Sequence, residues 1–522
     1  MWKKLLITGC VTFSLLSGGT LSAQPSCEIK EEVTSEQLDR TQKELVAMMK
    51  ELKNDSYFQT ELDKAAVQSS LSKRMAAYKD LTVRLLSVLE IQAELEWMKP
   101  EAIQEALGIM KKSSGFDAVL ADKRFGELKS LLAGGFDGIY TGDAQAIDKA
   151  NKTLTLKRKL MLMSPDVNVD KMLTVKFDLG ERANFVGAGS LGIQPNNWSN
   201  LSSASRKNFK AQLVELSGLQ SGELSEKVLY KPAVDGSSVT DLVLNWDGKR
   251  LMFTALDTTR RWQVHELDIN NGEAKQVTNI PEPDLEFFDG TYLPDGRMLA
   301  ISNIGYQGVP CVNGSDAVGN MVLYDPSNGY LRRLTFDQDA NWHPVVMANG
   351  KVMYVRWEYT DLTHYFSRIV MHMNPDGTEQ KSLYGSGSMF PNSIFDVQPL
   401  PKHTNRFVGV ISGHHGVARS GRLMIFDPAK SRKEEKGMIQ ELPFRGRPII
   451  PEVKDELVNG VWPQFIKPYP LTDETFLVTA KLSPYSRWGI YLVDIYDNLT
   501  LVANADDAGM IYSVPVKSTP IP

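Results

Sequence analysis

The spacing of apolar residues along the chain changes near residue 165. From residue 35 to about residue 163, apolar residues recur three and four positions apart, as in the segment QLDRTQKELVAMMKELK, and this spacing predicts amphipathic helices. Pro100 suits the first turn of a helix, and Gly134-Gly135 marks a break between helices. The first part of the chain is therefore predicted to be a bundle of about five helices.

Short strands separated by turns dominate the rest of the sequence. A turn followed by a strand recurs, and its clearest copies are LNWDGKRLMFTA (244–255), YLPDGRMLAISN (292–303) and VMANGKVMYVRW (346–357). Less regular copies follow at residues 399–412 and 468–481, and each copy precedes a second hairpin. The turn residues Asp247, Asp295 and Asn349 are 48 and 54 positions apart. A repeat of roughly 40 to 55 residues with four short strands is typical of a β-propeller blade.

The repeats predict the domain organisation. Five copies are clear, and residues 172–179 together with 211–230 supply a sixth, irregular copy. We therefore expect an all-β six-bladed propeller at residues 166–515, preceded by an α-helical domain at residues 28–165. The Pro-containing residues 516–522 are expected to form a tail.

The first 23 residues have the pattern of an export signal. A short Lys-Lys start is followed by an apolar run from Leu5 to Leu21 and by a Ser-Ala pair, as in a cleaved signal peptide. The apolar run is more polar and shorter than the roughly 20 residues of a membrane-spanning helix, and no later segment comes close. We expect a periplasmic or extracellular protein without a transmembrane helix. A lipid anchor on Cys10 or Cys27 fits the pattern less well.

Net charge and cysteine content bear on partners and cofactors. The net charge of −5 and the isoelectric point near 5.9 provide no basic surface for a nucleic-acid backbone, so we expect no nucleic-acid partner. No Cys-x-x-Cys-His motif occurs, so the chain has no site for covalent haem attachment. After signal cleavage Cys27 and Cys311 remain, and whether they pair stays open.

Residues with metal-binding or acid–base chemistry gather in loops that a propeller brings to one face. The segments leading into the first strands carry Asp289, His343, Asn392 and Trp462. Imidazole and thiolate groups suit a transition metal such as zinc, and the metal-ligand candidates are Cys311, His343, His364 and His414. The candidates for holding another ligand are Arg356, Glu358, Asp361, Arg419 and His415. The alternative is that histidine and arginine only join loops by hydrogen bonds, with Cys311 packed as a small apolar residue.

Several motifs in order resemble one protein family. They are YQGVPCVNGSD, LTFDQDANWHP, RWEYTDLTHYFSRI, MNPDGT, GHHGVARSGRL and NGVWPQFIKPYPL. Over roughly residues 173–514 the sequence resembles exported bacterial proteins related to the alpha subunit of hydrazine synthase, through that subunit's middle domain. The PDGR-type turns also resemble the repeats of TolB-type propellers. The resemblance implies an extracytoplasmic propeller domain and, in the namesake enzyme, a multihaem complex that joins nitric oxide and ammonium into hydrazine.

Two functions are compatible with these features. The first is a binding or scaffold module that holds a protein partner or a small ligand on the loop-rich face of the propeller. The second is a metal-dependent or redox enzyme with a Cys/His site on the same face. Because the haem attachment motif is absent, hydrazine synthesis by this chain alone is not expected, and we favour the binding module.

Overall fold

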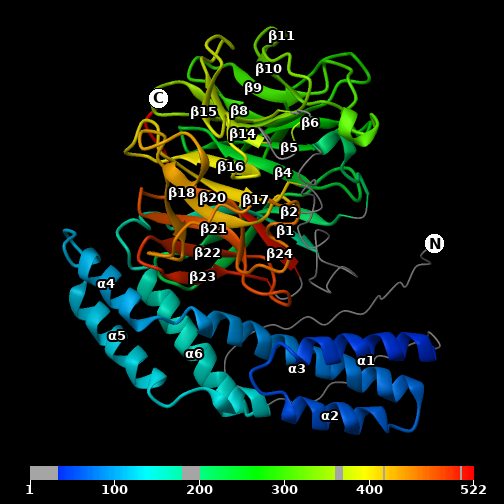
Figure 1. The fold of residues 1–522 in the computed structure, drawn as a ribbon, viewed down its shortest axis with the longest axis vertical. Helices are drawn as coiled ribbons and strands as arrows, with labels where there is room; N and C mark the ends of the chain where they lie inside the picture. The colour runs from blue at the N-terminus through cyan, green and yellow to red at the C-terminus, as the bar shows by residue number, and fades with distance from the viewer. Residues whose placement is uncertain are drawn as a thin grey trace. The chain divides into compact units, whose positions relative to one another are not determined.

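The computed structural model describes residues 33–178, 200–207, 209–358, 362, 368–414, 418–505 and 508–522 (Figure 1). The chain forms two compact units: one holds the residues up to Ser87 with Tyr140–Gly142, and the other holds Val88–Ile139 with Asp143–Pro522. The predicted signal peptide and Cys27 lie outside the described residues.

The first unit is helical. It contains α1 (Ser35–Met49), α2 (Ser56–Ala66) and the first part of α3 (Leu71–Glu96). At the start of α1 the Gln37 N–H donates to the Thr34 hydroxyl at 3.2 Å, and the Gln37 side chain accepts from the Thr34 N–H at 2.8 Å. This reciprocal pair satisfies N–H groups that a helix start leaves without a partner. Leu38, Leu45 and Met49 are buried on one side of α1, as their spacing predicts.

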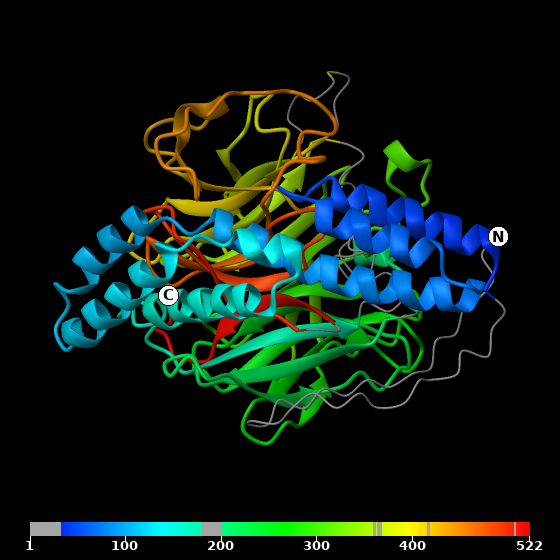
Figure 2. The same cartoon turned by 90° about the horizontal axis from the view of Figure 1, so that it is seen from below.

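The helices of the second unit pack against its β-sheets. They are the rest of α3, α4 (Pro100–Met110), α5 (Ala118–Leu132), the short 3-10 helix η1 (Asp137–Thr141), which crosses the division between the units, and α6 (Ala144–Met161). Leu160 of α6 shares a buried apolar cluster with Leu492 and Val502, and Lys157 Nζ donates to the Leu499 carbonyl at 2.8 Å. Figure 2 shows the cyan helices beside the red strands. The domain boundary expected near residue 165 stays a prediction. The two compact units described above are divided within α3, between Ser87 and Val88.

Most of the second unit is antiparallel β-sheet. The last strand pairs with the first, in a sheet ordered β24 (Ala508–Pro515), β1 (Lys171–Asp178), β2 (Ala211–Ser217) and β3 (Ser225–Tyr230). The next sheet contains β4 (Val239–Leu244), β5 (Arg250–Leu256), β6 (Trp262–Asp268) and β7 (Ala274–Gln276). It is followed by β8 (Phe287–Tyr292), β9 (Met298–Ser302), β10 (Asn320–Asp325) and β11 (Tyr330–Arg333).

Three further groups of four strands complete the second unit. The first two contain β12 (Asn341–Val346), β13 (Val352–Trp357), β14 (Arg368–Met373) and β15 (Lys381–Tyr384), then β16 (Ser393–Pro399), β17 (Phe407–Ser412), β18 (Arg422–Phe426) and β19 (Met438–Leu442). One parallel pairing, Arg368 with Ser393, joins these two groups. The last sheet contains β20 (Gln464–Pro470), β21 (Thr475–Lys481), β22 (Gly489–Asp494) and β23 (Leu499–Ala503).

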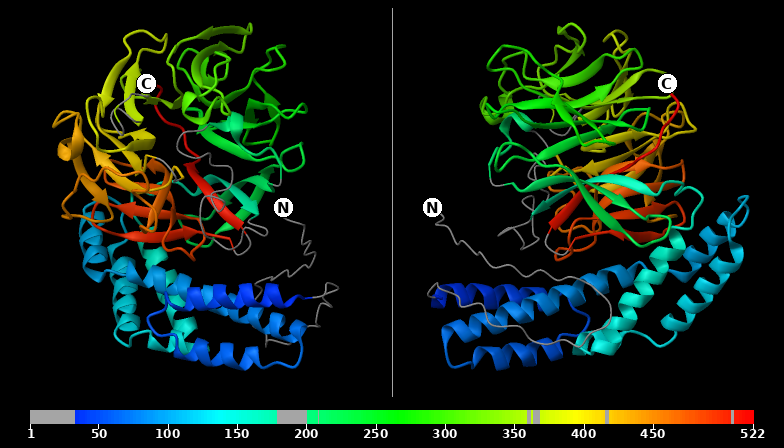
Figure 3. Two further views of the ribbon diagram at one scale, coloured as in Figure 1. Left: turned by 45° about the vertical axis from the view of Figure 1, so that its right-hand side comes forward. Right: turned by 180° about the vertical axis from the view of Figure 1, so that it is seen from behind.

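The first strands of these groups are neighbours in space. β4, β8, β12, β16, β20 and β24 contact one another in this order, and β24 also contacts β4. Figure 3 shows the sheets side by side, with the red C-terminal strand beside the strand near residue 175, as its pairing with β1 requires. The aromatic rings of Trp342 and Phe395 are buried between adjacent groups, 5.8 Å apart. This arrangement brings one strand from each group to the centre of the unit.

The C-terminal residues 516–522 run along the sheets rather than away from them. The Val516 N–H donates to the Lys171 carbonyl at 2.9 Å, and the Thr519 N–H donates to the Trp246 carbonyl at 2.9 Å. Among the described residues, no helix combines the length and the apolar character that crossing a membrane requires.

Candidate functional site

Six polar residues, one from each of the central strands, share an unusual backbone conformation. Their φ angles lie between 49° and 73°, in the left-handed region that non-glycine residues rarely adopt. We call them the polar cluster: Asp241 (β4), Asp289 (β8), His343 (β12), Asp396 (β16), Lys467 (β20) and Tyr512 (β24).

The left-handed residues sit where the pairing of their strands shifts. The register between β4 and β5 shifts after Thr240, and that between β8 and β9 shifts after Phe288. Such a bulge re-aims one side chain out of the regular alternation of the strand. The left-handed conformation costs an ordinary residue roughly 1–2 kcal/mol, so it persists only where other contacts hold it.

Hydrogen bonds between the cluster members supply those contacts. The Asp289 N–H donates to Asp241 Oδ2 at 3.0 Å, and the His343 N–H donates to the Asp289 carboxylate. The Lys467 N–H donates to Asp396 Oδ2 at 3.0 Å. In each case a side chain on one central strand satisfies the backbone of the next strand. The cluster therefore ties the centre of the unit together.

The cluster also concentrates buried charge. Lys467 Nζ lies 2.8 Å from Asp396 Oδ1, and both side chains are at most 10% exposed. Burial raises the pKa of Asp241, and the charge of Asp289 adds to the effect. Burial also opposes ionisation of Asp289, but the hydrogen bond and charge of His343 outweigh it and hold the pKa of Asp289 below its usual value. Neighbouring carboxyl groups thus have pKa values shifted in opposite directions.

A small cavity lies beside the polar cluster. Five cluster members line it, together with Trp342, Phe395 and Arg419. Its volume is about 20 Å³, which is room for one or two water molecules. A substrate of ordinary size therefore does not fit between the central strands of this structure.

Arg419 reaches this cavity from the connection between β17 and β18. Its guanidinium carbon lies 4.8 Å from the ring centroid of Trp342 and 5.0 Å from that of Phe395. Burial lowers the pKa of Arg419 to about 10, although the carboxylates of the polar cluster oppose that shift. The chain packs closely here: a Cβ on Gly421 would lie 1.9 Å from the Ile411 carbonyl oxygen, so only glycine fits at that position.

The other candidates from the sequence lie in separate groups. Arg356 forms ion pairs with Glu358 and, at 3.3 Å, with Asp337, and this group is partly exposed. His414 Nδ1 lies 3.1 Å from Asp455 Oδ1. The structure therefore brings His343 and Arg419 to one cavity, while Arg356 pairs with Glu358 elsewhere.

The proposed metal ligands are only partly described. His343 has Asp289 at 3.5 Å from Nδ1 and Gln398 at 3.1 Å from Nε2. Cys311 lies in the short helix Pro310–Val312, but its side chain, like Asp361, His364 and His415, is outside the described part of the chain. Within the described residues, no group of three or more His, Cys, Asp or Glu side chains is placed to hold a metal ion. The described residues therefore leave the metal site of the sequence analysis untested.

Elemental analysis tests that site. Because His343 and His414 already have protein partners, and zinc needs all ligands within about 2.0 to 2.3 Å, we expect well under one transition metal per chain in purified protein. We also expect the His343→Ala/His414→Ala variant to contain the same amount. A stoichiometric metal in the wild type that the variant loses would contradict this expectation.

Four members of the polar cluster were missed by sequence reasoning: Asp241, Asp396, Lys467 and Tyr512. A signal for some of them exists in the repeat. Asp241 stands six positions before the turn residue Asp247, and Lys467 stands six before Asp473, as Asp289 stands six before Asp295. Extending the repeat alignment upstream of the turn would have found these positions.

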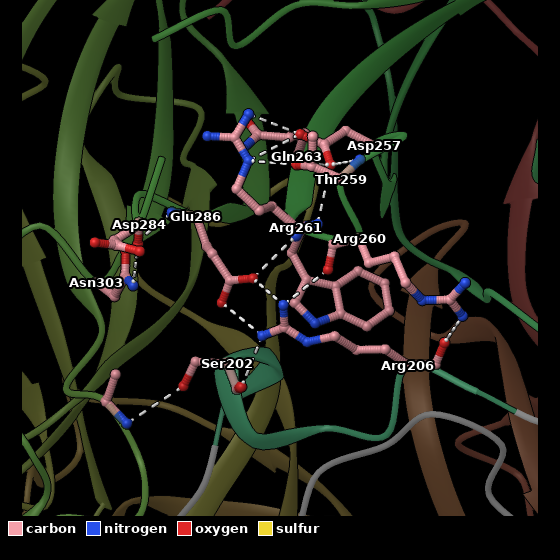
Figure 4. Close-up of polar contacts among 12 residues, drawn as sticks. Ser202, Arg206, Asp257, Thr259, Arg260, Arg261, Gln263, Asp284, Glu286 and Asn303 are labelled. Atoms are coloured by element: carbon pink, nitrogen blue, oxygen red, sulfur yellow. Dashed lines mark hydrogen bonds and ion pairs between the residues drawn. The ribbon is translucent and has the colours of Figure 1, made fainter. Parts of the chain in front are cut away.

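A second polar group is joined by an ion pair and several hydrogen bonds (Figure 4). Arg206 Nη1 lies 2.8 Å from Glu286 Oε1, and the same oxygen accepts the Trp262 N–H at 3.2 Å. Arg206 also donates to the Arg260 carbonyl at 2.8 Å, and Arg260 donates back to the Arg206 carbonyl at 2.7 Å. Burial raises the pKa of Glu286. These contacts fasten residues 200–207 to the sheets, so we assign this group a structural role.

Comparison with known proteins supports the fold but shows neither a family nor an activity. No family model matches the chain, and a search of curated proteins finds no match. Among solved structures, hydrazine synthase of Kuenenia stuttgartiensis is similar with a TM-score of 0.50 at 15% identity, over 67% of this chain and 47% of that chain. The chain thus spans about half the length of that protein. TolB of Acinetobacter baumannii matches with a TM-score of 0.41 at 10% identity, over 70% of this chain and 71% of that chain.

The likeness to hydrazine synthase shows a shared fold over 67% of this chain. The prediction of a mostly antiparallel, propeller-type β region that follows helices is confirmed at this level. At such low identity, a relation to the hydrazine synthase family and a shared activity do not follow.

Proposed function

We propose that this protein is an exported six-bladed β-propeller that acts as a binding or scaffold module through its loop-rich face. Six groups of four strands and the pairing of β24 with β1 support six blades, because one blade built from both ends of the propeller region closes the ring of blades. The signal-like first 23 residues support export.

The binding role is supported by the close packing between the central strands of the second unit. The polar cluster joins the central strands, and the cavity beside it measures only about 20 Å³. A partner protein or a small ligand would therefore meet the ends of the strands and the connections between them. The connections of a rigid β scaffold are the usual place for such contacts.

Charged groups on this face are available for recognition. Arg356 and Glu358 stand at the end of β13, and their side chains are 23% and 29% exposed. We propose them as ligand contacts, together with Asp361 and His415 from the neighbouring connections, whereas Arg419 lies in the cavity beside the polar cluster. A relation to the middle domain of the hydrazine synthase alpha subunit belongs to this proposal. It implies assembly into a larger extracytoplasmic complex rather than catalysis by this chain.

Site-specific photocrosslinking in the native host tests the use of this face. We expect a benzophenone amino acid at Leu362, which is 58% exposed and follows Glu358 by four positions in the sequence, to give a crosslinked product of defined mass. The matched control is the same amino acid at Tyr330, which is 51% exposed but lies on the outer strand β11. Equal products at both positions, or none at Leu362, would count against the proposal.

A further inference from the structure

The surroundings of Arg419 have the composition of a binding site for an organic cation. Two aromatic rings flank its guanidinium group, Trp342 at 4.8 Å and Phe395 at 5.0 Å. The face of an aromatic ring attracts a cation, most strongly where water is excluded. Arg419 is only 9% exposed, so this attraction acts away from bulk solvent.

Carboxylates supply the opposite charge. The charges of Asp396, Asp289 and Asp241 all act on Arg419 in favour of its protonated form, and each of these residues lines the same cavity. Lys467 neutralises one of them through its contact with Asp396. The other two are joined by the hydrogen bond from the Asp289 N–H to Asp241 Oδ2, and His343 Nδ1 lies 3.5 Å from Asp289 Oδ1. Arg419 adds a cation beside these three carboxyl groups.

We propose that the cavity beside the polar cluster is a binding site for cations of the guanidinium class, and that the side chain of Arg419 is its resident occupant. The proposal goes beyond the role of the loop-rich face, because this site lies among the central strands. The two rings meet edge to face at 69°. A planar, delocalised cation suits contact with both rings better than a compact ammonium, which holds its water more tightly. A ligand with a guanidinium group, such as an arginine side chain or a small alkylguanidine, has the required chemistry.

The residues that surround Arg419 also contact other residues, and these contacts should keep them in place when the Arg419 side chain is removed. Asp241 accepts the Asp289 N–H, and Asp396 accepts the Lys467 N–H. Trp342 also stacks on Trp357 with ring centroids 6.3 Å apart. Removing the Arg419 side chain should therefore leave a shaped cavity with unbalanced negative charge. Such a cavity is the condition for chemical rescue by a free cation.

Chemical rescue of the full-length Arg419→Ala variant tests the proposal. We expect 10 mM methylguanidinium chloride to raise the Tm of this variant by about 2 to 4 °C relative to 10 mM NaCl, as binding to the folded state requires. Tetramethylammonium at the same concentration should raise it less. The wild type should show no such rise, because its own Arg419 fills the site.

The control variant is Arg297→Ala, which removes an arginine that pairs with Asp295 on a surface turn. We expect methylguanidinium to have no effect on it beyond that of NaCl. If Arg419→Ala does not fold alone, its refolding yield with methylguanidinium and with NaCl gives the same comparison. Equal Tm values and equal refolding yields in the two salts would overturn the proposal, as would equal rescue of Arg297→Ala.

Discussion

The Asp396→Asn substitution should lower the free energy of unfolding by about 3 to 5 kcal/mol, which is the usual cost of removing one partner from a buried ion pair. Asp396 holds Lys467 Nζ at 2.8 Å and accepts the Lys467 N–H at 3.0 Å. Without its charge, Lys467 and Arg419 would stay buried with less compensation. Denaturant unfolding of wild type and variant at pH 7 measures the difference.

Asp295→Asn is the matched control. Asp295 contacts Arg297 at 2.5 Å, but the pair lies on an exposed turn, where an ion pair contributes roughly 0 to 1 kcal/mol. We expect a loss of less than about 1 kcal/mol for this variant. A similarly small loss for Asp396→Asn would show that the polar cluster does not hold the central strands together.

The Lys481→Met substitution should stabilise the protein. Lys481 is 1% exposed, and its Nζ atom has no hydrogen-bond partner among the described residues. The nitrogen lies 5.4 Å from the ring centroid of Trp462, which compensates only part of the lost hydration. Methionine fills a similar volume without a charge. Thermal unfolding at pH 6 should therefore give a higher Tm for the variant than for the wild type.

The stabilising effect should depend on pH in a defined direction. Burial lowers the pKa of Lys481 to about 7, against about 10.4 in an unfolded chain. The unfolded state therefore binds more protons between these values, and the cost of burying Lys481 falls as pH rises through this range. The cost is complete below pH 7 and amounts to about 5 kcal/mol for a shift of this size.

The advantage of Lys481→Met should accordingly be larger at pH 6 than at pH 10. The control is Lys430→Met, because Lys430 is an exposed lysine on a surface turn. Its Tm should match that of the wild type at both pH values. A gain for Lys481→Met that is the same at pH 6 and pH 10 would contradict the assigned cause.

The sequence predicted the type of fold because its signals are local. Apolar spacing indicated helices before residue 165 and strands after it, and the described chain has α-helices up to Met161 and strands from Lys171. The number of helices was less certain, since the described residues form six rather than about five. Where the connection between two helices is short, as between α1 and α2, the helical spacing of apolar residues continues without a visible break. The sequence then does not show that one helix ends and another begins.

The candidate site was harder to predict because its residues converge from distant positions. His343 and Arg419 were both singled out, but nothing in their own segments showed that one cavity would join them. Arg356 and Glu358 were expected on the same face and pair with each other instead. Tyr512 had no signal at all, yet its hydroxyl accepts the Asp241 N–H at 2.7 Å across 271 positions of the chain.

By itself the sequence determined the order of helices and strands, the repeat and the turns, since each depends on neighbours within a few residues. The tertiary structure alone decided which buried charges find partners. Lys467 and Lys481 both lie on strands of the last four-stranded sheet, but within the described part of the chain Lys467 meets a carboxylate and Lys481 Nζ has no hydrogen-bond partner. The reason is that a left-handed residue at the centre aims Lys467 toward Asp396 of the preceding group, and that geometry exists only when the central strands stand side by side.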